Sequence, residues 1–229
     1  MLATTRLVEE RAGVLSLLSA APTALRSLDA VGVHHGAHVS SIGRNCLASW
    51  EPFLAPLRDQ SCDMLHIGIG DGASLRTWRE WFPSARLVGF DARRIVLDPA
   101  IPDCLIVQGN QTDIFDLRPL LREYCFRLVI ADGSHHDDDQ IRAFELLFPW
   151  LDPGSIYICA GFEHRPYDPA ESPPDDDRRS GPAWFAELGL ALASNNPWSG
   201  PPLPRSGLDG VKRLSSGVYL TRGSVVVTR

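Results

Sequence analysis

The stretch LHIGIGDGAS, residues 65–74, decides the fold that this sequence predicts. An apolar run enters a turn that holds Gly68, Gly70 and Gly72 and then continues into a stretch compatible with a helix. Glycines suit a turn where a bound molecule approaches the backbone closely, because side chains penalise the required conformations. The spacing is G-x-G-x-G, so the dinucleotide pattern G-x-G-x-x-G is not met, and the chain has no G-x-x-x-x-G-K-[ST] phosphate loop. Hydride-transfer and NTPase functions are therefore disfavoured.

Short apolar runs follow one another at regular intervals from residue 64 onward. They cover residues 64–69, 86–90, 104–107, 127–131 and 155–159. Continuous apolar runs are typical of parallel strands that helices cover on both faces, and the stretches between them supply the helices, most clearly at 74–82 and 139–151. Two β-rich runs, 211–221 and 224–228, are expected to add strands at the sheet edge. The pattern predicts an α/β fold: a doubly wound, Rossmann-like, seven-stranded and mostly parallel sheet.

The chain divides into a lead-in and one main domain. Residues 1–60 read as a helical and partly irregular segment, with helical patches at 7–28 and 47–57 around a Gly/His/Ser-rich stretch at 32–43. We expect this segment to serve as a lid or in oligomer contacts, and residues 61–229 to form the ligand-binding domain. The Pro-rich stretches 161–181 and 195–210 are expected to be loops or a lid.

Composition narrows the function classes. A hydrophobic fraction of 44% and a charged fraction of 22% are those of an ordinary globular protein, and the net charge of −6 offers no basic surface for nucleic acid. No run reaches the roughly 18 apolar residues that a membrane span needs. The five cysteines are widely spaced and form no C-x-x-C pair, which indicates a reducing, cytoplasmic location.

Two carboxylates and a histidine follow the predicted strands. Asp91 ends the second apolar run, where an acid can accept hydrogen bonds from ribose hydroxyls, so with the glycine turn it fits an adenosine-containing cofactor. The fourth run ends in Asp132-Gly-Ser-His135, which places both side chains at the carboxyl edge of the sheet. His135 is the candidate general base, and Asp132 would orient it or hold a cation. The alternatives are an ordinary structural turn at 68–72 and a helix cap with solvated charges at 132–139.

Three stretches together resemble a known family. They are LHIGIGDGASLRTWREWFPSARLVGFDARR (65–94), VQGNQTD (107–113) and RLVIADGSHHDDDQIRAFELLFPWLDPGSIYI (127–158). They are similar to the class I S-adenosylmethionine-dependent methyltransferases that modify sugars in macrolide antibiotics, the mycinamicin and macrocin O-methyltransferase group. The D-G-S-H turn followed by F-x-x-L-F-P-x-L-x-P-G carries most of the likeness.

The resemblance implies roles for individual residues. Asp132 would correspond to the family's metal-ligand aspartate and His135 to its catalytic base, and S-adenosylhomocysteine would be the product of the cofactor. The residues that it assigns to S-adenosylmethionine, besides Asp132, are Gly68, Gly70, Gly72 and Ser74 for the methionine and ribose parts, Asp91 for the ribose hydroxyls, and Asn110 and Gln111 near the adenine.

The acids of the family's Mg2+ site are missing. The Glu-Asp pair expected after the fifth strand is Ala160-Gly161, and His66, Asn110, Ala131 and Asp139 also depart from the family pattern. Divalent cations of this kind need several oxygen ligands, and Asp132 alone is too few. We therefore assign no metal-binding residues, with Glu163, Asp137 and Asp138 as the side chains that would have to improvise a site.

The resulting expectation is methyl transfer to a hydroxyl or amine of a small specialised metabolite, such as a sugar or antibiotic intermediate. The alternatives are a non-methylating cyclisation or elimination in the same fold, and a non-catalytic scaffold subunit. Partners would be a small-molecule acceptor and a second copy in a homodimer, with no nucleic acid and no membrane.

Other polar and aromatic clusters receive secondary roles. We expect His34, His35 and His38 to face the substrate from a loop, with a metal as the less favoured reading, and the acidic run 175–179 to be solvated. Among the tryptophans, the expected core members are Trp78, Trp81 and Trp150, and the expected acceptor-pocket members are Trp184 and Trp198.

Overall fold

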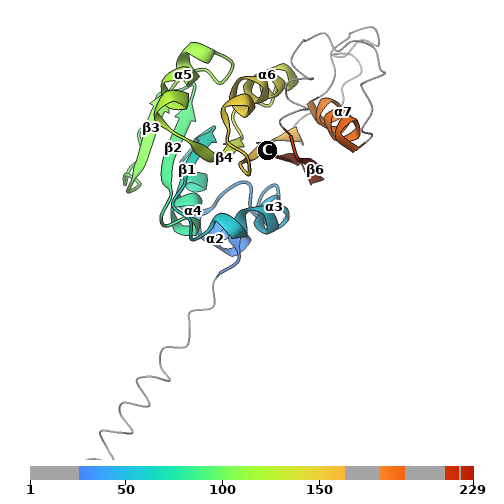
Figure 1. Cartoon of the computed structure of the whole chain (residues 1–229). Helices are drawn as coiled ribbons and strands as arrows, with labels where there is room; N and C mark the ends of the chain where they lie inside the picture. The colour runs from blue at the N-terminus through green and yellow to red at the C-terminus, as the bar shows by residue number, and fades with distance from the viewer. Residues whose placement is uncertain (1–25, 163–180, 194–214, 222) are drawn as a thin grey trace, which may run out of the picture.

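The computed structural model describes residues 26–162, 181–193, 215–221 and 223–229. Its centre is a seven-stranded sheet in the order β3-β2-β1-β4-β5-β7-β6 (Figure 1). The strands are β1 (Asp63–Ile67), β2 (Arg86–Asp91), β3 (Cys104–Gln108), β4 (Phe126–Ala131), β5 (Ile156–Ala160), β6 (Gly217–Thr221) and β7 (Ser224–Thr228). Strands β1 to β5 are parallel, whereas β7 pairs antiparallel with both β5 and β6. The predicted α/β fold and its mostly parallel sheet are confirmed.

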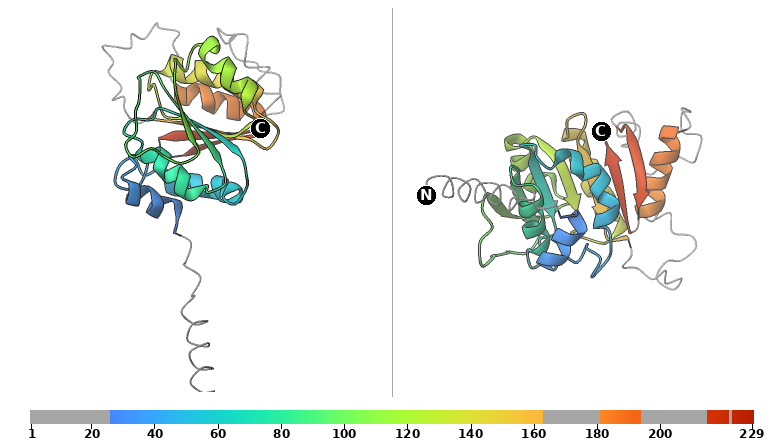
Figure 2. Two further views of the ribbon diagram at one scale, coloured as in Figure 1. Left: turned by 90° about the vertical axis from the view of Figure 1, so that its left-hand side faces the viewer. Right: turned by 90° about the horizontal axis from the view of Figure 1, so that it is seen from below.

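Helices cover both faces of the sheet. One face carries α2 (Leu28–His35), α3 (Leu47–Leu54) and α4 (Ala73–Trp81), and the other carries α5 (Ile114–Glu123), α6 (Asp137–Leu147) and α7 (Gly181–Ala193). Figure 2, on the left, shows these two helical layers with the sheet between them. Short 3-10 turns follow α3 and α6, at Ala55–Leu57 and Phe148–Trp150. None of the helices in the described ranges is long and apolar enough to cross a membrane.

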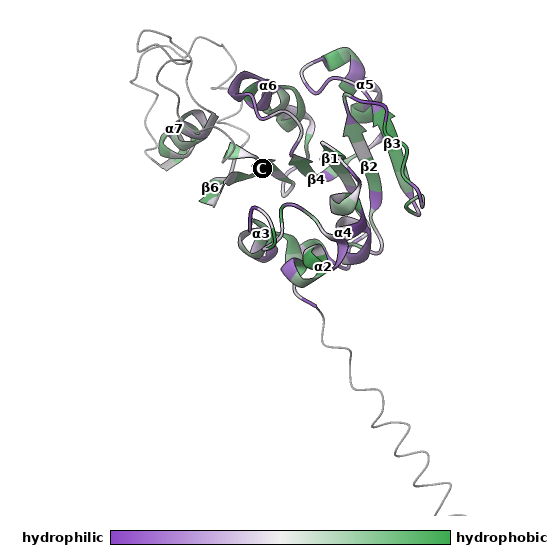
Figure 3. Ribbon diagram, turned by 180° about the vertical axis from the view of Figure 1, so that it is seen from behind, coloured by the Kyte–Doolittle hydropathy of each residue, from purple (hydrophilic) through white to green (hydrophobic). Residues whose placement is uncertain are grey.

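Each face of the sheet has its own apolar core. Trp50 and Trp78 lie in the first core with their rings stacked at 6.4 Å, and Phe144 and Phe185 lie in the second at 5.1 Å. Figure 3 shows both hydrophobic and hydrophilic colouring on the flanking helices, as expected when one side of a helix is buried. The buried aromatic rings supply much of the apolar area that stabilises the sheet between the two layers.

The described part of the lead-in, from residue 26 onward, packs against the sheet domain. Leu28 and Leu47 lie in the same core as Trp78. The Trp50 indole donates a 2.8 Å hydrogen bond to the hydroxyl of Ser224, which begins β7. Residues 28–57 therefore form part of one face of the molecule rather than a detached arm.

Several sequence expectations need correction. The stretch 32–43 is not all loop, because α2 runs from Leu28 through Gly32 to His35. The close packing of Leu47 against this helix leaves room only for glycine at position 32. Trp150 is 50% exposed rather than in the core, because the chain breaks into a 3-10 turn at Pro149.

Trp184 also differs from expectation, whereas the predicted strand 224–228 is confirmed as β7. Trp184 is buried in α7 against Phe144 and Phe185, so it belongs to the core and does not line the cleft described below. Helix α7 was not singled out by the sequence. Strand β6 begins at Gly217, and Trp198, Glu163 and the acidic run 175–179 lie outside the described residues.

Candidate functional site

A cleft of about 960 Å³ opens at the carboxyl ends of β1, β2 and β4. This is the point where the strand order reverses, since β2 and β3 continue from one side of β1 and β4 and β5 from the other. Ligands bind at such switch points in open α/β sheets, and the volume lies at the upper end of the roughly 300–1,000 Å³ of small-molecule sites. The cleft brings together most of the residues singled out from the sequence: Gly68, Gly70, Ser74, Asp91, Asn110, Gln111, Asp132 and His135.

Gly68 joins the ends of β1, β2 and β4. Its N–H donates to the carbonyl of Phe90 at 2.8 Å, and its φ of +89° is in the region that favours glycine. A Cβ at this position would lie 2.2 Å from the carbonyl oxygen of Asp132. Glycine at position 68 is therefore required by the packing of β1 against β4 as well as by the cleft.

The other two glycines of the turn differ from each other. Gly70 faces the cleft, and a Cβ added there would meet nothing within 4 Å. Gly72 precedes α4 with φ +84°, and its Cβ would lie 2.7 Å from Leu97, so it packs behind the turn and does not line the cleft. Gly72 is therefore explained by packing alone, without a ligand.

Asp91 is a buried carboxylate at the end of β2. Its Oδ2 accepts from the backbone N–H of Ile69 at 2.9 Å, and its Oδ1 accepts from the backbone N–H of Arg93 at 2.9 Å. Burial raises the pKa of Asp91, but the hydrogen bonds from Arg93 and Ile69 outweigh it and lower the pKa below its usual value. The group is therefore an ionised acceptor at neutral pH, as ribose binding would need.

Gln111 links β3 to the turn after β4. Its Oε1 accepts from the backbone N–H of Ser134 at 2.9 Å, while its Nε2 is buried and makes no hydrogen bond within the described residues. Asn110 lies at the cleft rim, and its Oδ1 accepts from the backbone and hydroxyl of Thr112. A buried amide donor on a side chain that lines the cleft, as at Gln111, is suited to a polar ligand.

Asp132 is paired with an arginine that the sequence analysis missed. The guanidinium of Arg44 donates through Nη2 to Oδ2 of Asp132, and the two side chains are only 5% and 10% exposed. Arg44 also lines the cleft, with Gly36 and His38. The carboxylate that corresponds to the metal ligand of the resembling family is therefore bound to a cation of the protein itself.

A hydrogen-bonded loop fixes the backbone that carries Arg44. The N–H of Arg44 donates to the carbonyl of His38 at 2.7 Å, and that of Cys46 donates to the carbonyl of Val39 at 2.8 Å. A Cβ on Gly43 would lie 2.1 Å from the carbonyl oxygen of His38, so the loop requires glycine there. No spacing in the sequence announces this arrangement, apart from the glycines that make the loop compact.

His135 lies in the turn between β4 and α6, against the end of β5. A Cβ on Gly161 would lie 2.0 Å from Nδ1 of His135, so the imidazole occupies the space of a side chain at position 161. Ser134 donates to Asp139 at 2.6 Å, which ties the same turn to the first turn of α6. Helix α6 has His136 as its N-cap and no side-chain cap hydrogen bond, so the alternative of a side-chain cap from this turn is not borne out. The turn instead presents His135 to the cleft.

The described residues at the ends of β4 and β5 do not fit an octahedral Mg2+ site. Asp132 is engaged by Arg44, and Ala160 and Gly161 offer no side-chain oxygen. Mg2+ and similar ions bind through several oxygen ligands. Among the described residues that line the cleft, no second carboxylate accompanies Asp132 at the ends of β4 and β5.

His66 stands beneath the glycine turn, in place of the acid that the family pattern would have. It is 1% exposed, and its Nδ1 lies 3.3 Å from the indole nitrogen of Trp78, which donates to it. Burial lowers the pKa of His66 to about 4, so the ring is neutral at physiological pH. It is a core residue that supports the turn.

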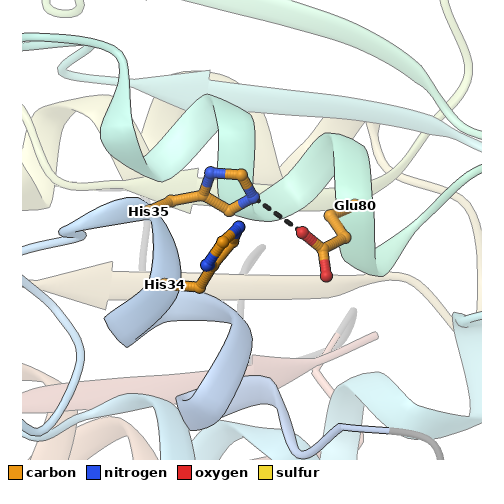
Figure 4. Close-up of side chains that lie close together, drawn as sticks. All are labelled: His34, His35 and Glu80. Atoms are coloured by element: carbon orange, nitrogen blue, oxygen red, sulfur yellow. Dashed lines mark hydrogen bonds and ion pairs between the residues drawn. The ribbon is translucent and has the colours of Figure 1, made fainter.

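A second cluster lies between α2 and α4, outside the cleft. His34, His35 and Glu80 place their ligand-type atoms within 4.8 Å of one another, and His35 Nε2 lies 2.8 Å from Glu80 Oε2 (Figure 4). Glu80 also pairs with Arg26. The polar contacts of Glu80 therefore link α4 to α2 through His35, which explains the cluster as a structural contact between the two helices. His34 and His35 therefore do not face the cleft as expected, whereas His38 does.

By sequence the chain is similar to curated O-methyltransferases of antibiotic pathways, although no protein-family model matches it. It is 27% identical over 150 residues to 8-demethyl-8-alpha-L-rhamnosyl tetracenomycin-C 2'-O-methyltransferase of Streptomyces olivaceus, covering 62% of this chain and 39% of that protein. It is 35% identical over 112 residues to mycinamicin VI 2''-O-methyltransferase of Micromonospora griseorubida, covering 44% of this chain and 27% of that protein. The chain thus spans well under half the length of these curated relatives, and they confirm the predicted resemblance.

A solved structure matches the fold over almost the whole chain. It is that of MycE methyltransferase from the mycinamycin biosynthetic pathway, in complex with Mg, SAH and mycinamycin VI. The TM-score is 0.76 at 22% identity, with 99% of this chain and 59% of that chain covered. At this level of identity the likeness establishes a methyltransferase-type fold.

Proposed function

We propose that this chain is an S-adenosylmethionine-dependent methyltransferase that acts on a hydroxyl or amine of a small specialised metabolite, such as a sugar or antibiotic intermediate. The observation that carries the proposal is the cleft at the switch point of the sheet, where Gly68, Asp91 and His135 meet in one site. Curated relatives that methylate antibiotic sugars, and a solved relative of the same fold that holds SAH, support the same reading.

The cofactor would lie between the glycine turn and the end of β2. Gly68 and Gly70 would face its methionine and ribose parts together with Ser74, while Asp91 would accept from the ribose hydroxyls. When bound, the cofactor would supply a methyl group carried on a positively charged sulfur. The methyl group would pass to the acceptor and the electron pair of the S–C bond would stay on sulfur, giving S-adenosylhomocysteine. The buried Nε2 of Gln111 is a donor suited to the adenine, beside Asn110 at the rim.

His135 would take the proton of the acceptor. Its Nδ1 is buried beside Gly161, so we assign proton transfer to Nε2. General base catalysis of this kind contributes about 10²–10⁴-fold, and positioning of the acceptor supplies much of the rest. Asp132 would act by holding Arg44 next to the acceptor, and the reaction would proceed without the Mg2+ site of the resembling family.

The surroundings of the site complete the proposal. The lead-in, which contributes His38 and Arg44 to the cleft, would act as part of a lid and in homodimer contacts, with residues 61–229 forming the cofactor-binding domain. All five cysteines are free thiols, in keeping with a cytoplasmic location. A net charge of −6 argues against nucleic-acid partners.

The test is methyl transfer from labelled S-adenosylmethionine to a panel of glycosylated polyketides and free amino and deoxy sugars. We expect S-adenosylhomocysteine to form with one acceptor class, and His135→Ala to lower kcat by about 10²–10⁴-fold. His136→Ala is the matched control, because this neighbouring side chain is exposed and does not line the cleft.

Two outcomes would favour the alternatives. A product formed from the acceptor with no S-adenosylhomocysteine would indicate a cyclisation or elimination in the same fold. Absence of any conversion, together with copurification of an active partner subunit, would indicate a scaffold.

A further inference from the structure

We propose that the guanidinium of Arg44 takes the place of a divalent cation in this cleft, and that it stabilises the acceptor oxygen as its proton leaves. The inference rests on the proposed methyl transfer and adds the residue that makes it independent of metal. In this account Asp132 positions Arg44 and is not a metal ligand.

The first observation is the buried ion pair itself. Arg44 and Asp132 come from positions 88 residues apart and meet at the end of β4 with side chains 5% and 10% exposed. A charge held this far from water is costly unless it is paired, so the two groups require each other. A cation that bound Asp132 would have to displace Arg44 and leave a buried guanidinium without its carboxylate.

The second observation lies on the neighbouring strand. Gly161, directly after β5, has a φ of +95°, and a Cβ there would meet the imidazole of His135 at 2.0 Å. A carboxylate at position 161 is therefore incompatible with the present place of His135. Within the described residues, two independent features, one at the end of β4 and one at the end of β5, thus leave these strand ends without the carboxylate ligands that a divalent ion would need.

The third observation is the rigidity of the support for Arg44. The loop that carries it is closed by hydrogen bonds from Arg44 to His38 and from Cys46 to Val39, at 2.7 and 2.8 Å. Ser40 within the loop is fully buried and donates to the carbonyl of Ala37 at 2.6 Å. Groups that stabilise charge in a reaction act best when they are fixed in advance, as Arg44 is here.

These features define what Arg44 does. As the acceptor oxygen forms its bond to the methyl carbon, the S–C bond would break with its electron pair left on sulfur, and the proton of the acceptor would go to His135. The negative charge that develops on the oxygen would face the guanidinium of Arg44. Arg44 bears a permanent charge over the whole physiological pH range, so this stabilisation needs no metal and no protonation step. The structure thereby favours acceptors with a neutral hydroxyl, whose deprotonation a fixed cation assists.

The metal arm of the test uses Mn2+, whose free ion is detected by paramagnetic resonance, and the full chain stripped with EDTA. We expect no Mn2+ to bind at the cleft of the wild-type protein. Glu80→Gln serves as a control, because it removes the carboxylate of the other candidate cluster, at His34 and His35. One bound Mn2+ per chain that persists in Glu80→Gln and is lost in Asp132→Asn would overturn the inference.

The catalytic arm uses Arg44→Met and Arg44→Lys with the acceptor found in the panel. We expect Arg44→Met to lower kcat about 10²–10³-fold with the Kd of S-adenosylhomocysteine changed less than about threefold, and Arg44→Lys to restore part of the rate. Arg44→Met/Asp132→Asn, which leaves neither charge unpaired, keeps the test valid if the single variant unfolds. Wild-type turnover that is lost in EDTA and restored by Mg2+ would contradict the inference.

The two arms also separate this inference from the proposed function. If S-adenosylhomocysteine neither binds nor forms, the proposed methyl transfer fails. The Mn2+ titration still decides whether the cleft takes a divalent cation.

Discussion

Acidification from pH 6.5 to about 4 should destabilise this protein through His66. His66 is buried under the glycine turn, where its Nδ1 accepts from the indole of Trp78 at 3.3 Å. Burial lowers the pKa of His66 to about 4, against 6.5 for an exposed histidine. Charging this ring in the folded state would place an imidazolium in the apolar core that contains Trp78.

The direction and size of the effect follow from that difference. Between pH 6.5 and 4 the unfolded chain binds a proton at His66 and the folded chain does not, so the free energy of unfolding falls as the pH falls. At about 1.4 kcal/mol for each pH unit, the loss approaches roughly 3 kcal/mol by pH 4. Above pH 6.5 His66 contributes no pH dependence to the free energy of unfolding. The lowered pKa of Asp91 reduces the free energy of unfolding only as the pH falls below the ordinary pKa of a carboxyl group.

The assay is urea unfolding at a series of pH values, compared with His66→Gln and with His136→Gln as an exposed control. We expect the wild type and the control to lose stability in parallel, by an amount equivalent to roughly 6–12 °C in Tm, and His66→Gln to lose far less. The comparison concerns the slope with pH, so a constant loss in the variant does not matter. Equal slopes in all three proteins would refute the burial argument.

Three further predictions concern the cleft. Gly68→Ala should lower the free energy of unfolding by more than about 3 kcal/mol, because its Cβ would meet the Asp132 carbonyl at 2.2 Å. Gly70→Ala should lower it by only about 1–2 kcal/mol, because its Cβ would meet nothing within 4 Å. Similar unfolding midpoints for the two variants would count against this geometry. Asp91→Asn should weaken S-adenosylhomocysteine binding about 10–100-fold by calorimetry, since it removes charged hydrogen bonds, and unaltered affinity would remove Asp91 from the ribose site. Gly161→Ala should displace His135 and lower turnover with little change in cofactor affinity; full activity in this variant would show that His135 is not held as described.

Much of the fold was predictable because its signals are local. Each parallel strand is mostly apolar, as with Met64, Leu65 and Ile67 of β1, and a glycine or a carboxylate at or directly after its last residue marks the edge of the sheet. Since the carboxyl ends of parallel strands meet at one edge, the sequence also placed Asp91, Asp132 and His135 in one cleft.

The rest depends on contacts that no local pattern encodes. Arg44 reaches Asp132 only because a loop folds back on His38, and the two partners are 88 residues apart. Gly72 shares the spacing of Gly68 and Gly70, yet it packs against Leu97 and misses the cleft. Trp150 lies within a helical pattern that the 3-10 turn at Pro149 interrupts, and this turn exposes the ring.

The most direct measurement for the central claim is calorimetric titration of the full chain with S-adenosylhomocysteine in EDTA and again in Mg2+. We expect binding of one molecule per chain, with the same affinity in both buffers, because the cleft supplies its own cation at Arg44. Absence of binding in both buffers would contradict the cofactor cleft, and binding that requires Mg2+ would contradict the role of Arg44.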